Sequence, residues 1–323
     1  MRCLSAVSDT ESVSHENIQS AMYRVIQILG STDLPLVRYA TGFLCNVAAR
    51  NRDNKAYLCE NKAIENLMRV LEVLSSSTQV PTELSWIYQE IFDNTLLAIS
   101  NLTSNYNVVG YVQHACRQIV QKSNSMKILL NTLVMGNFLI KSRVLVILNR
   151  VITNEPNAHL FFVDVLDDKN HMNYVFTIYS LLFDAVDAFV DPEKHAELKD
   201  RLQDMSVKLL KILREFMKNR GFAQQIINLS RNHKNPITLL SKLGHTQLGI
   251  TLLEFVDDLL EDDDLLVEWN KNDEIRAILE MCSNSPINEL AKISAHLLRR
   301  IHPLINFNEG YFSNNFDWEM SNY

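Results

Sequence analysis

The chain has 323 residues, of which 47% are hydrophobic, and its mean hydropathy is close to zero. That composition allows a large buried core and excludes a disordered polymer. Glycine (8) and proline (7) are both scarce. Because hairpins and sandwich turns depend on those two residues, their scarcity favours helices over sheets.

The net charge of −7 is unevenly distributed. Residues 1–160 hold 14 Lys and Arg against 12 Asp and Glu, whereas residues 161–323 hold 17 against 26. The acidic second half argues against direct binding of nucleic acid, because phosphates require a basic footprint. The first half, which leans basic, suits an acidic partner.

The cysteines and the apolar runs indicate the compartment. Five cysteines are scattered without a CxxC pair, as is typical of reduced thiols in the cytoplasm or nucleus. The polar N-terminus does not resemble a signal peptide, and no apolar run is long enough to span a bilayer. We therefore expect a protein of the nucleus and cytoplasm with no membrane partner.

A short apolar helix followed by a longer one recurs along the chain. The predicted long helices cover 34–51, 91–105, 138–154, 205–219, 245–260 and 288–301, and the first three follow shorter helices at 22–30, 64–74 and 126–136. One helix pair cannot bury its apolar stripe alone, so about six such units must stack into one array. We place this array at 1–306, with an insertion or an extended helix pair within 163–204.

Each of the first three long helices carries an asparagine near its end, namely Asn46, Asn101 and Asn149. Their spacings are somewhat longer than the roughly 40–47 residues of armadillo or HEAT units, and loops at 75–83 and 103–107 absorb the excess. An asparagine side chain can both donate to and accept from a peptide main chain. The alternative is that each one caps a helix end or bonds a neighbouring loop.

Residues 29–59, LGSTDLPLVRYATGFLCNVAARNRDNKAYLC, resemble a β-catenin armadillo repeat. The likeness rests on the LGS lead-in, the ATGFLCN helix and the NK pair followed by a cysteine. Segments 96–104 and 140–159 and the closing helix fall in the order of later repeats. The whole chain resembles the C-terminal half of a divergent, nematode-like β-catenin, either as a fragment or as a short isoform. The resemblance implies an all-α, right-handed armadillo superhelix.

In that family the long helices line a basic groove that holds extended acidic peptides of TCF/LEF transcription factors, cadherin tails and axin-type scaffolds. The resemblance implies that groove asparagines clamp the peptide main chain and that lysines meet its carboxylates. The candidate groove residues here are Asn46, Arg50, Lys55, Asn101, Lys141 and Asn149. Arg143 and Arg150 add basic charge on the same helix. Arg150 stands where the family has an apolar residue, and the alternative is that it faces solvent.

The chain also departs from the family pattern. Ala6 stands where a groove asparagine is expected, and Ser100–Asn101 replaces an Arg-His pair used for axin-type contacts. The resemblance therefore implies a Wnt-pathway transcriptional coactivator that binds a TCF/LEF-type factor. The alternatives are an adaptor that presents such a factor to a kinase, and a generic ARM/HEAT scaffold with an unrelated partner.

No motif indicates catalysis, a metal or a cofactor. The acidic run at 261–269 lacks the ligand spacing of an EF-hand and is interpreted as a solvated helix end. There is no HExxH, GxSxG or P-loop motif. The importin-α pattern also fails, because Gly42, Leu97 and Leu145 stand four residues before the asparagines instead of tryptophan. We expect a binding protein without enzymatic activity.

The tail at 307–323 interleaves aromatic and acidic residues. Such alternation resembles an activation segment. The alternative, which we favour, is that the aromatics cap the last repeat.

Overall fold

The computed structural model describes residues 15–76, 82–104, 109–122, 124–162, 165, 171–191, 193, 196–243 and 246–301. Within these ranges the chain forms helices and no strand. The chain divides into two compact units, residues 1–233 and 234–323, which are described separately below. The predicted all-α class is confirmed.

Unit 1 consists of helices in a repeating order. Its elements are α2 (His15–Ile28), α3 (Leu34–Arg50), α4 (Arg52–Glu60), α5 (Ala63–Ser76), η1 (Thr82–Leu84), α6 (Ser85–Leu102), α7 (Val109–Gln121), α8 (Ser125–Met135), α9 (Phe138–Asn154), η2 (Ala158–Phe162), α11 (His171–Val190), α12 (Ala196–Met217) and α13 (Arg220–Asn232).

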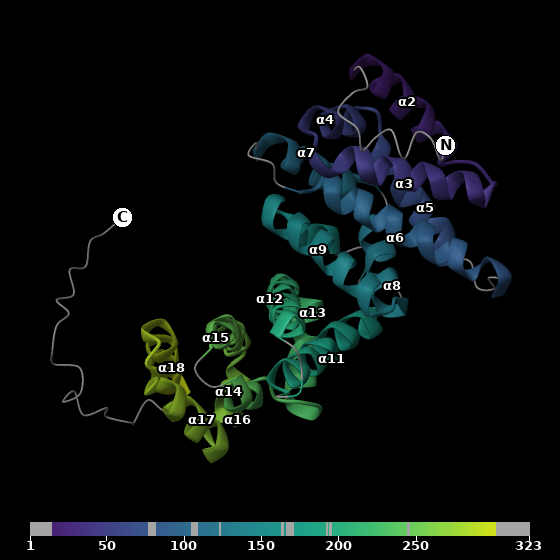
Figure 1. The fold of residues 1–323 in the computed structure, drawn as a ribbon. Helices are drawn as coiled ribbons and strands as arrows, with labels where there is room; N and C mark the ends of the chain where they lie inside the picture. The colour runs from purple at the N-terminus through teal and green to yellow at the C-terminus, as the bar shows by residue number, and fades with distance from the viewer. Residues whose placement is uncertain are drawn as a thin grey trace. The chain divides into compact units, whose positions relative to one another are not determined.

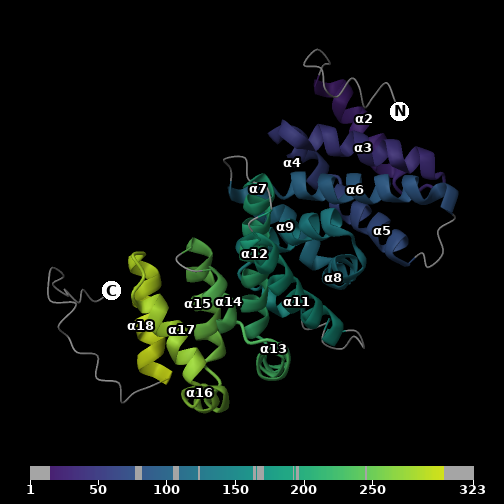
Figure 2. The same cartoon turned by 60° about the horizontal axis from the view of Figure 1, so that its bottom comes forward.

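Two layers organise this unit. Helices α3, α6, α9 and α12 each pack against the next one, and we call them the long-helix layer. Helices α5, α8 and α11 pack in the same order to form a second layer (Figures 1 and 2). Helices α5, α8 and α11 also pack against α6, α9 and α12 respectively, so neighbouring repeats stack as a repeat array requires.

Local sequence sets the helix boundaries in the first repeats. The Asp33 carboxylate accepts the Leu36 amide at 3.1 Å and so starts α3, with proline in its first turn. The Asn137 side chain caps α9 in the same way. The long helix that follows α5 begins at Ser85, whereas the sequence predicted its start at residue 91. The η1 turn just before it shortens the predicted loop.

The core of unit 1 lies between the layers. Helix α9 is the clearest case, because Val144, Leu145, Ile147, Leu148 and Val151 are all fully buried. Burying each such side chain contributes about 1.5–3 kcal/mol. The run 144–148 is apolar nearly all round because α9 packs between neighbours on several sides.

Unit 2 repeats the two-layer arrangement on a smaller scale. Its helices are α14 (Ile237–Leu243), α15 (Gln247–Leu259), α16 (Asp263–Asn270), α17 (Asp273–Ser283) and α18 (Asn288–Ile301). Helix α15 packs against α18, and α14 packs against α17. The guanidinium of Arg300 on α18 donates to the Leu260 carbonyl at 3.0 Å and closes the end of α15. The acidic run is the start of α16, where Asp262 accepts the Leu265 amide at 2.8 Å.

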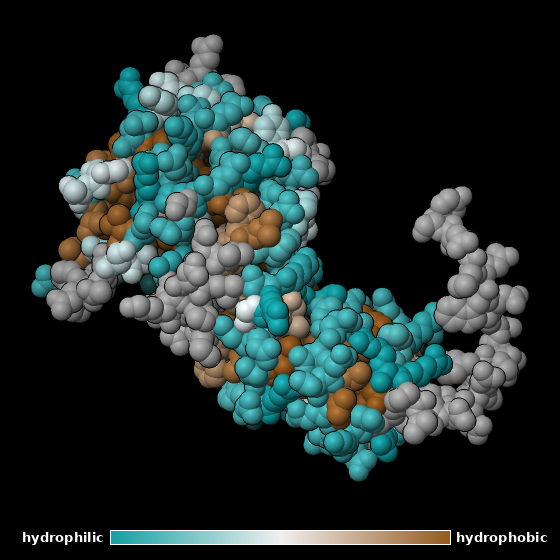
Figure 3. Space-filling view, turned by 180° about the vertical axis from the view of Figure 1, so that it is seen from behind, coloured by the Kyte–Doolittle hydropathy of each residue, from teal (hydrophilic) through white to brown (hydrophobic). Residues whose placement is uncertain are grey.

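The surface is mainly hydrophilic on the face seen in Figure 3, with local apolar patches on both units. Exposed large apolar side chains include Trp86, Met135, Phe138 and Leu139. Within the described ranges, no helix is both long enough and apolar enough to cross a membrane.

The structure describes only part of the region after residue 162 for which the sequence made specific predictions. The described part of 163–204 contains α11 and the beginning of α12, helices of 20 and 22 residues. The tail at 307–323 lies outside the described residues, so its cap and activation interpretations both stay predictions. The single array over 1–306 also stays a prediction.

Candidate functional site

The corner between α3 and α4 brings Lys55 back toward the long-helix layer. Asn51 ends α3 and also caps α4, since its side chain accepts the Asn54 amide at 2.9 Å. The side chain of Asn54 donates in turn from Nδ2 to the Val47 carbonyl of α3 at 3.2 Å. These two bonds fix the first turn of α4, and Lys55 lies in that turn.

Lys55 is buried, with only 5% of its surface exposed. Its ammonium Nζ donates to the hydroxyl of Ser104 at 2.6 Å, across from the end of α6. Burial lowers the pKa of Lys55 below 10.5, and the positive charge of Arg150 lowers it further. The structure therefore holds this ammonium against Ser104, which lies just past the end of α6.

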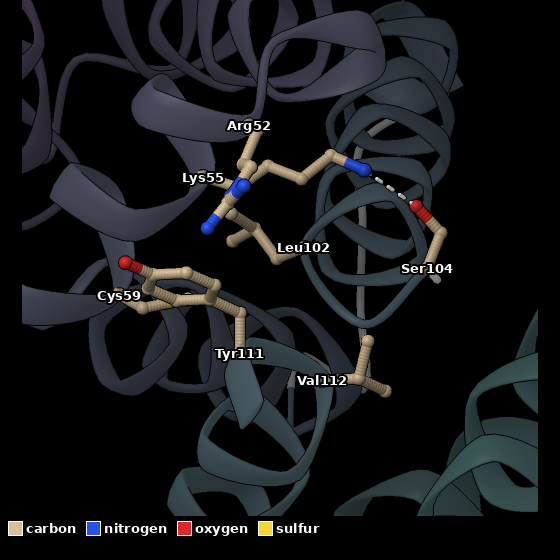
Figure 4. A pocket seen from close by; sticks show the side chains of 7 residues that line it. All are labelled: Arg52, Lys55, Cys59, Leu102, Ser104, Tyr111 and Val112. Atoms are coloured by element: carbon tan, nitrogen blue, oxygen red, sulfur yellow. Dashed lines mark hydrogen bonds between the residues drawn. The ribbon is translucent and has the colours of Figure 1, made fainter. Parts of the chain in front are cut away.

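A small pocket that opens to solvent adjoins this ammonium (Figure 4). Its described lining residues are Arg52, Lys55, Cys59, Leu102, Ser104, Tyr111 and Val112. The guanidinium of Arg52 lies 5.4 Å from the centre of the Tyr111 ring, within the range of a cation–π contact. Two cations and no carboxylate are found among the described lining residues, so the pocket suits an anionic group beside an apolar one.

Arg150 on α9 supports the same corner from the other side. Its Nη1 donates to the Ser100 carbonyl, to the Ser100 hydroxyl at 3.0 Å and to the Thr103 hydroxyl at 3.4 Å. Burial lowers the pKa of its guanidinium. The alternative that Arg150 faces solvent is therefore wrong. This guanidinium satisfies backbone and hydroxyl oxygens at the end of α6, which an apolar residue could not do.

The three predicted asparagines have different environments. Asn46 is half-buried on α3. Asn101 donates from Nδ2 to the Cys45 carbonyl at 3.1 Å and so joins α6 to α3. The Oδ1 atom of Asn149 is buried and accepts no hydrogen bond from the described residues. Asn101 thus has a structural role, because it bonds the backbone of a neighbouring helix. Asn149 has an acceptor atom with no donor among the described residues.

The remaining predicted cations are more scattered. Lys141 is half-buried near the start of α9. It lies eight residues from Asn149, about 12 Å along the helix axis. Arg143 binds Asp93 of α6, with 2.8 Å to its carbonyl and 3.0 Å to its carboxylate. Arg50 ends α3, but its side chain lies outside the described residues.

The structure therefore brings together Lys55, Asn101 and Arg150 around the end of α6, with Asn46 near them. Sequence reasoning missed Arg52, Ser104 and Tyr111. Ser104 belonged to a segment interpreted as a loop, and Tyr111 lies on α7, a helix that the sequence did not predict. Only the packing of α4 against α6 and α7 could have identified them.

Nucleophilic and metal chemistry have little support in the described ranges. Burial raises the pKa of Cys45 to about 11 and the pKa values of Cys59 and Cys116 to about 12. Such thiols stay protonated and unreactive at neutral pH. No group of three or more His, Cys, Asp or Glu residues in those ranges could hold a metal ion.

Comparison with known proteins gives a family match. Residues 1–197 match the family described as the WRM-1 armadillo protein C-terminal domain. The armadillo repeat-containing protein wrm-1 of Caenorhabditis elegans is 27% identical over 176 residues, which are 53% of this chain and 22% of that protein. The Armadillo segment polarity protein of Drosophila melanogaster is 28% identical over 102 residues, 32% of this chain and 11% of that protein. The chain thus matches less than a quarter of the length of these curated relatives.

Solved structures give the same fold. A crystal structure of the SYS-1/POP-1 complex has a TM-score of 0.62 and 20% identity, covering 93% of this chain and 50% of that chain. A structure from work on the interaction between cadherin and beta-catenin has a TM-score of 0.61 and 14% identity, covering 92% of this chain and 54% of that chain. At these identities the likeness is one of fold.

Proposed function

Because the chain belongs to the family of the WRM-1 armadillo protein C-terminal domain, we propose that it is a β-catenin-like scaffold that binds an extended acidic peptide. The partner class is the N-terminal segment of a TCF/LEF-type transcription factor. A cadherin tail is a second ligand of similar chemistry. The protein has no catalytic role in this proposal. It acts as a Wnt-pathway coactivator in the nucleus and cytoplasm.

The observation that carries the proposal is the pocket around Lys55. Two cations line it together with Leu102, Val112 and the Tyr111 ring. A carboxylate there meets a positive charge that is largely shielded from water, so the contact is stronger than a surface ion pair. An apolar side chain beside the carboxylate has a surface to bury. This is the chemistry of an acidic peptide with interspersed apolar residues.

The relatives support the partner class. Two similar structures come from studies of protein complexes, SYS-1 with POP-1 and cadherin with beta-catenin. The long-helix layer gives the chain the same scaffold, with α3, α6 and α9 adjacent. The kinase adaptor and the generic scaffold stay predictions, since no observed contact favours either.

Isothermal titration calorimetry with a synthetic TCF-type acidic peptide tests the proposal on the full chain. Lys55→Glu should weaken binding by about a hundredfold, because it removes the attraction and places a like charge in the pocket. The control is Lys271→Glu, an exposed lysine at the end of α16 in the other unit, which gives the same change in net charge. Equal affinities for the wild type and Lys55→Glu would refute the groove, and no binding by the wild type would refute the partner class.

A further inference from the structure

The hydroxyl of Ser104 makes two hydrogen bonds of opposite sense. It donates to the Asn101 carbonyl at 2.7 Å and accepts from the Lys55 ammonium at 2.6 Å. Figure 4 shows the Lys55 side chain reaching across the pocket to this oxygen. The backbone at the end of α6 therefore orients a hydroxyl that in turn holds the ammonium.

The segment that carries Ser104 is itself fixed. The Thr103 hydroxyl donates to the Ile99 carbonyl at 2.9 Å and is fully buried. Arg150 donates to the Ser100 carbonyl and the Thr103 hydroxyl from α9. Ser104 thus follows an anchored helix end, which places its oxygen at a defined point opposite α4.

A lysine side chain ordinarily loses considerable rotamer entropy when it is immobilised by a ligand. Lys55 has already lost much of that freedom, because its stem is buried and its Nζ is bonded to Ser104. An ammonium carries three N–H donors, so its bond to the Ser104 hydroxyl does not by itself exclude a carboxylate. A cation that is fixed in advance gives tighter binding for the same contact.

We propose that Ser104 is a positioning residue for Lys55, and that its hydroxyl holds the ammonium in the place where a carboxylate of the acidic ligand meets it. The proposal rests on the proposed function, and it adds a residue that does not itself need to touch the peptide. It also links the repeats, since α9 acts on Lys55 through the end of α6.

The affinity test uses Ser104→Ala and Ser104→Thr in the full chain, with the same synthetic acidic peptide and calorimetry. Ser104→Ala should weaken binding about three- to tenfold, the cost of immobilising one long side chain. Ser104→Thr keeps the hydroxyl and should restore most of the affinity. In a Lys55→Met background the alanine change should have no further effect, because the group that it positions is gone.

A matched control separates positioning from local structure. Ser75, at the end of α5, also donates its hydroxyl to the carbonyl three residues earlier, at 3.0 Å to Glu72. Ser75→Ala removes the same kind of local bond without a lysine partner, so its affinity should equal that of the wild type. A Ser104→Ala loss that persists in the Lys55→Met background would overturn the proposal, as would Ser104→Ala binding as tightly as the wild type.

A second readout needs no peptide. In protein labelled with ¹⁵N-lysine, a hydrogen-bonded ammonium exchanges its protons slowly and gives its own Nζ signal. The Lys55 signal, assigned with Lys55→Met, should be present in the wild type and in Ser75→Ala, and should be lost or shifted in Ser104→Ala. An unchanged signal in Ser104→Ala would refute positioning. If this signal responds but the peptide does not bind, the proposed function fails while the bond that positions Lys55 is real.

Discussion

Replacing Arg150 by methionine should loosen the contact between α6 and α9. The substitution keeps a long side chain that can fill the space of the arginine stem, and it removes the guanidinium. The oxygens that lose a donor are the Ser100 carbonyl, the Ser100 hydroxyl and the Thr103 hydroxyl. Both hydroxyl groups and the end of α6 are buried, so water replaces the lost donor poorly.

The size of the effect follows from the geometry. One Nη1 atom has two hydrogens, so at most two of the three contacts form at once. A hydrogen bond from a charged donor contributes about 1.5–3 kcal/mol, and the methionine recovers part of the loss by avoiding the desolvation of a guanidinium. We therefore expect the free energy of unfolding of unit 1 to fall by about 2–3 kcal/mol.

Two measurements check this expectation. Urea denaturation followed by circular dichroism gives the change in stability. Hydrogen exchange measured by mass spectrometry locates it, since repeat arrays open locally, and α6 and α9 should lose protection before unit 2 does. Arg201→Met is the control, because Arg201 is exposed and its ion-pair partner among the described residues is Glu197, one turn away. Its effect should stay below about 0.5 kcal/mol.

Equal stability of Arg150→Met and the wild type, with unchanged exchange at the end of α6, would refute this reasoning. The guanidinium would then be solvated, and its role would be reduced to long-range attraction of an acidic ligand.

Three further outcomes are expected. Affinity for the acidic peptide should decline as pH rises toward 10.5, and the decline should begin at a lower pH than an ordinary lysine would give. The reason is that the depressed pKa of Lys55 makes its side chain lose its charge earlier. Calorimetry should show no such decline for Lys55→Met. Gly136→Ala should destabilise the chain by about 1–3 kcal/mol in urea denaturation, because the added Cβ would lie 2.8 Å from a backbone carbonyl oxygen. At Gly110 an added Cβ meets nothing within 4 Å, so Gly110→Ala should be neutral or slightly stabilising. In a Cys3→Ser variant, the remaining thiols are those of the buried Cys45, Cys59, Cys116 and Cys282. The native protein should therefore react slowly with a thiol reagent at neutral pH, and the denatured protein should expose all four. Fast labelling of the native protein would contradict their burial.

The fold class was predictable from the sequence because local sequence patterns identify the helices of the repeats. The apolar stripes at 34–51 and 138–154 have the helical period, and their caps, Asp33 and Asn137, stand just before them. Such signals depend on neighbours within a few residues. The start of α6 was missed, because no side-chain cap marks Ser85.

The candidate site was only partly predictable. Lys55 and Asn101 were identified by resemblance to β-catenin, and both lie at the corner of α3, α4 and α6. The sequence by itself predicted the all-α class, the order of the long helices and the candidate groove residues. Only the tertiary structure decided that Ser104 holds Lys55 and that Arg150 is bonded at the end of α6. Those pairs are about 50 residues apart, and helical periodicity carries no information at that range about which polar groups meet when repeats stack.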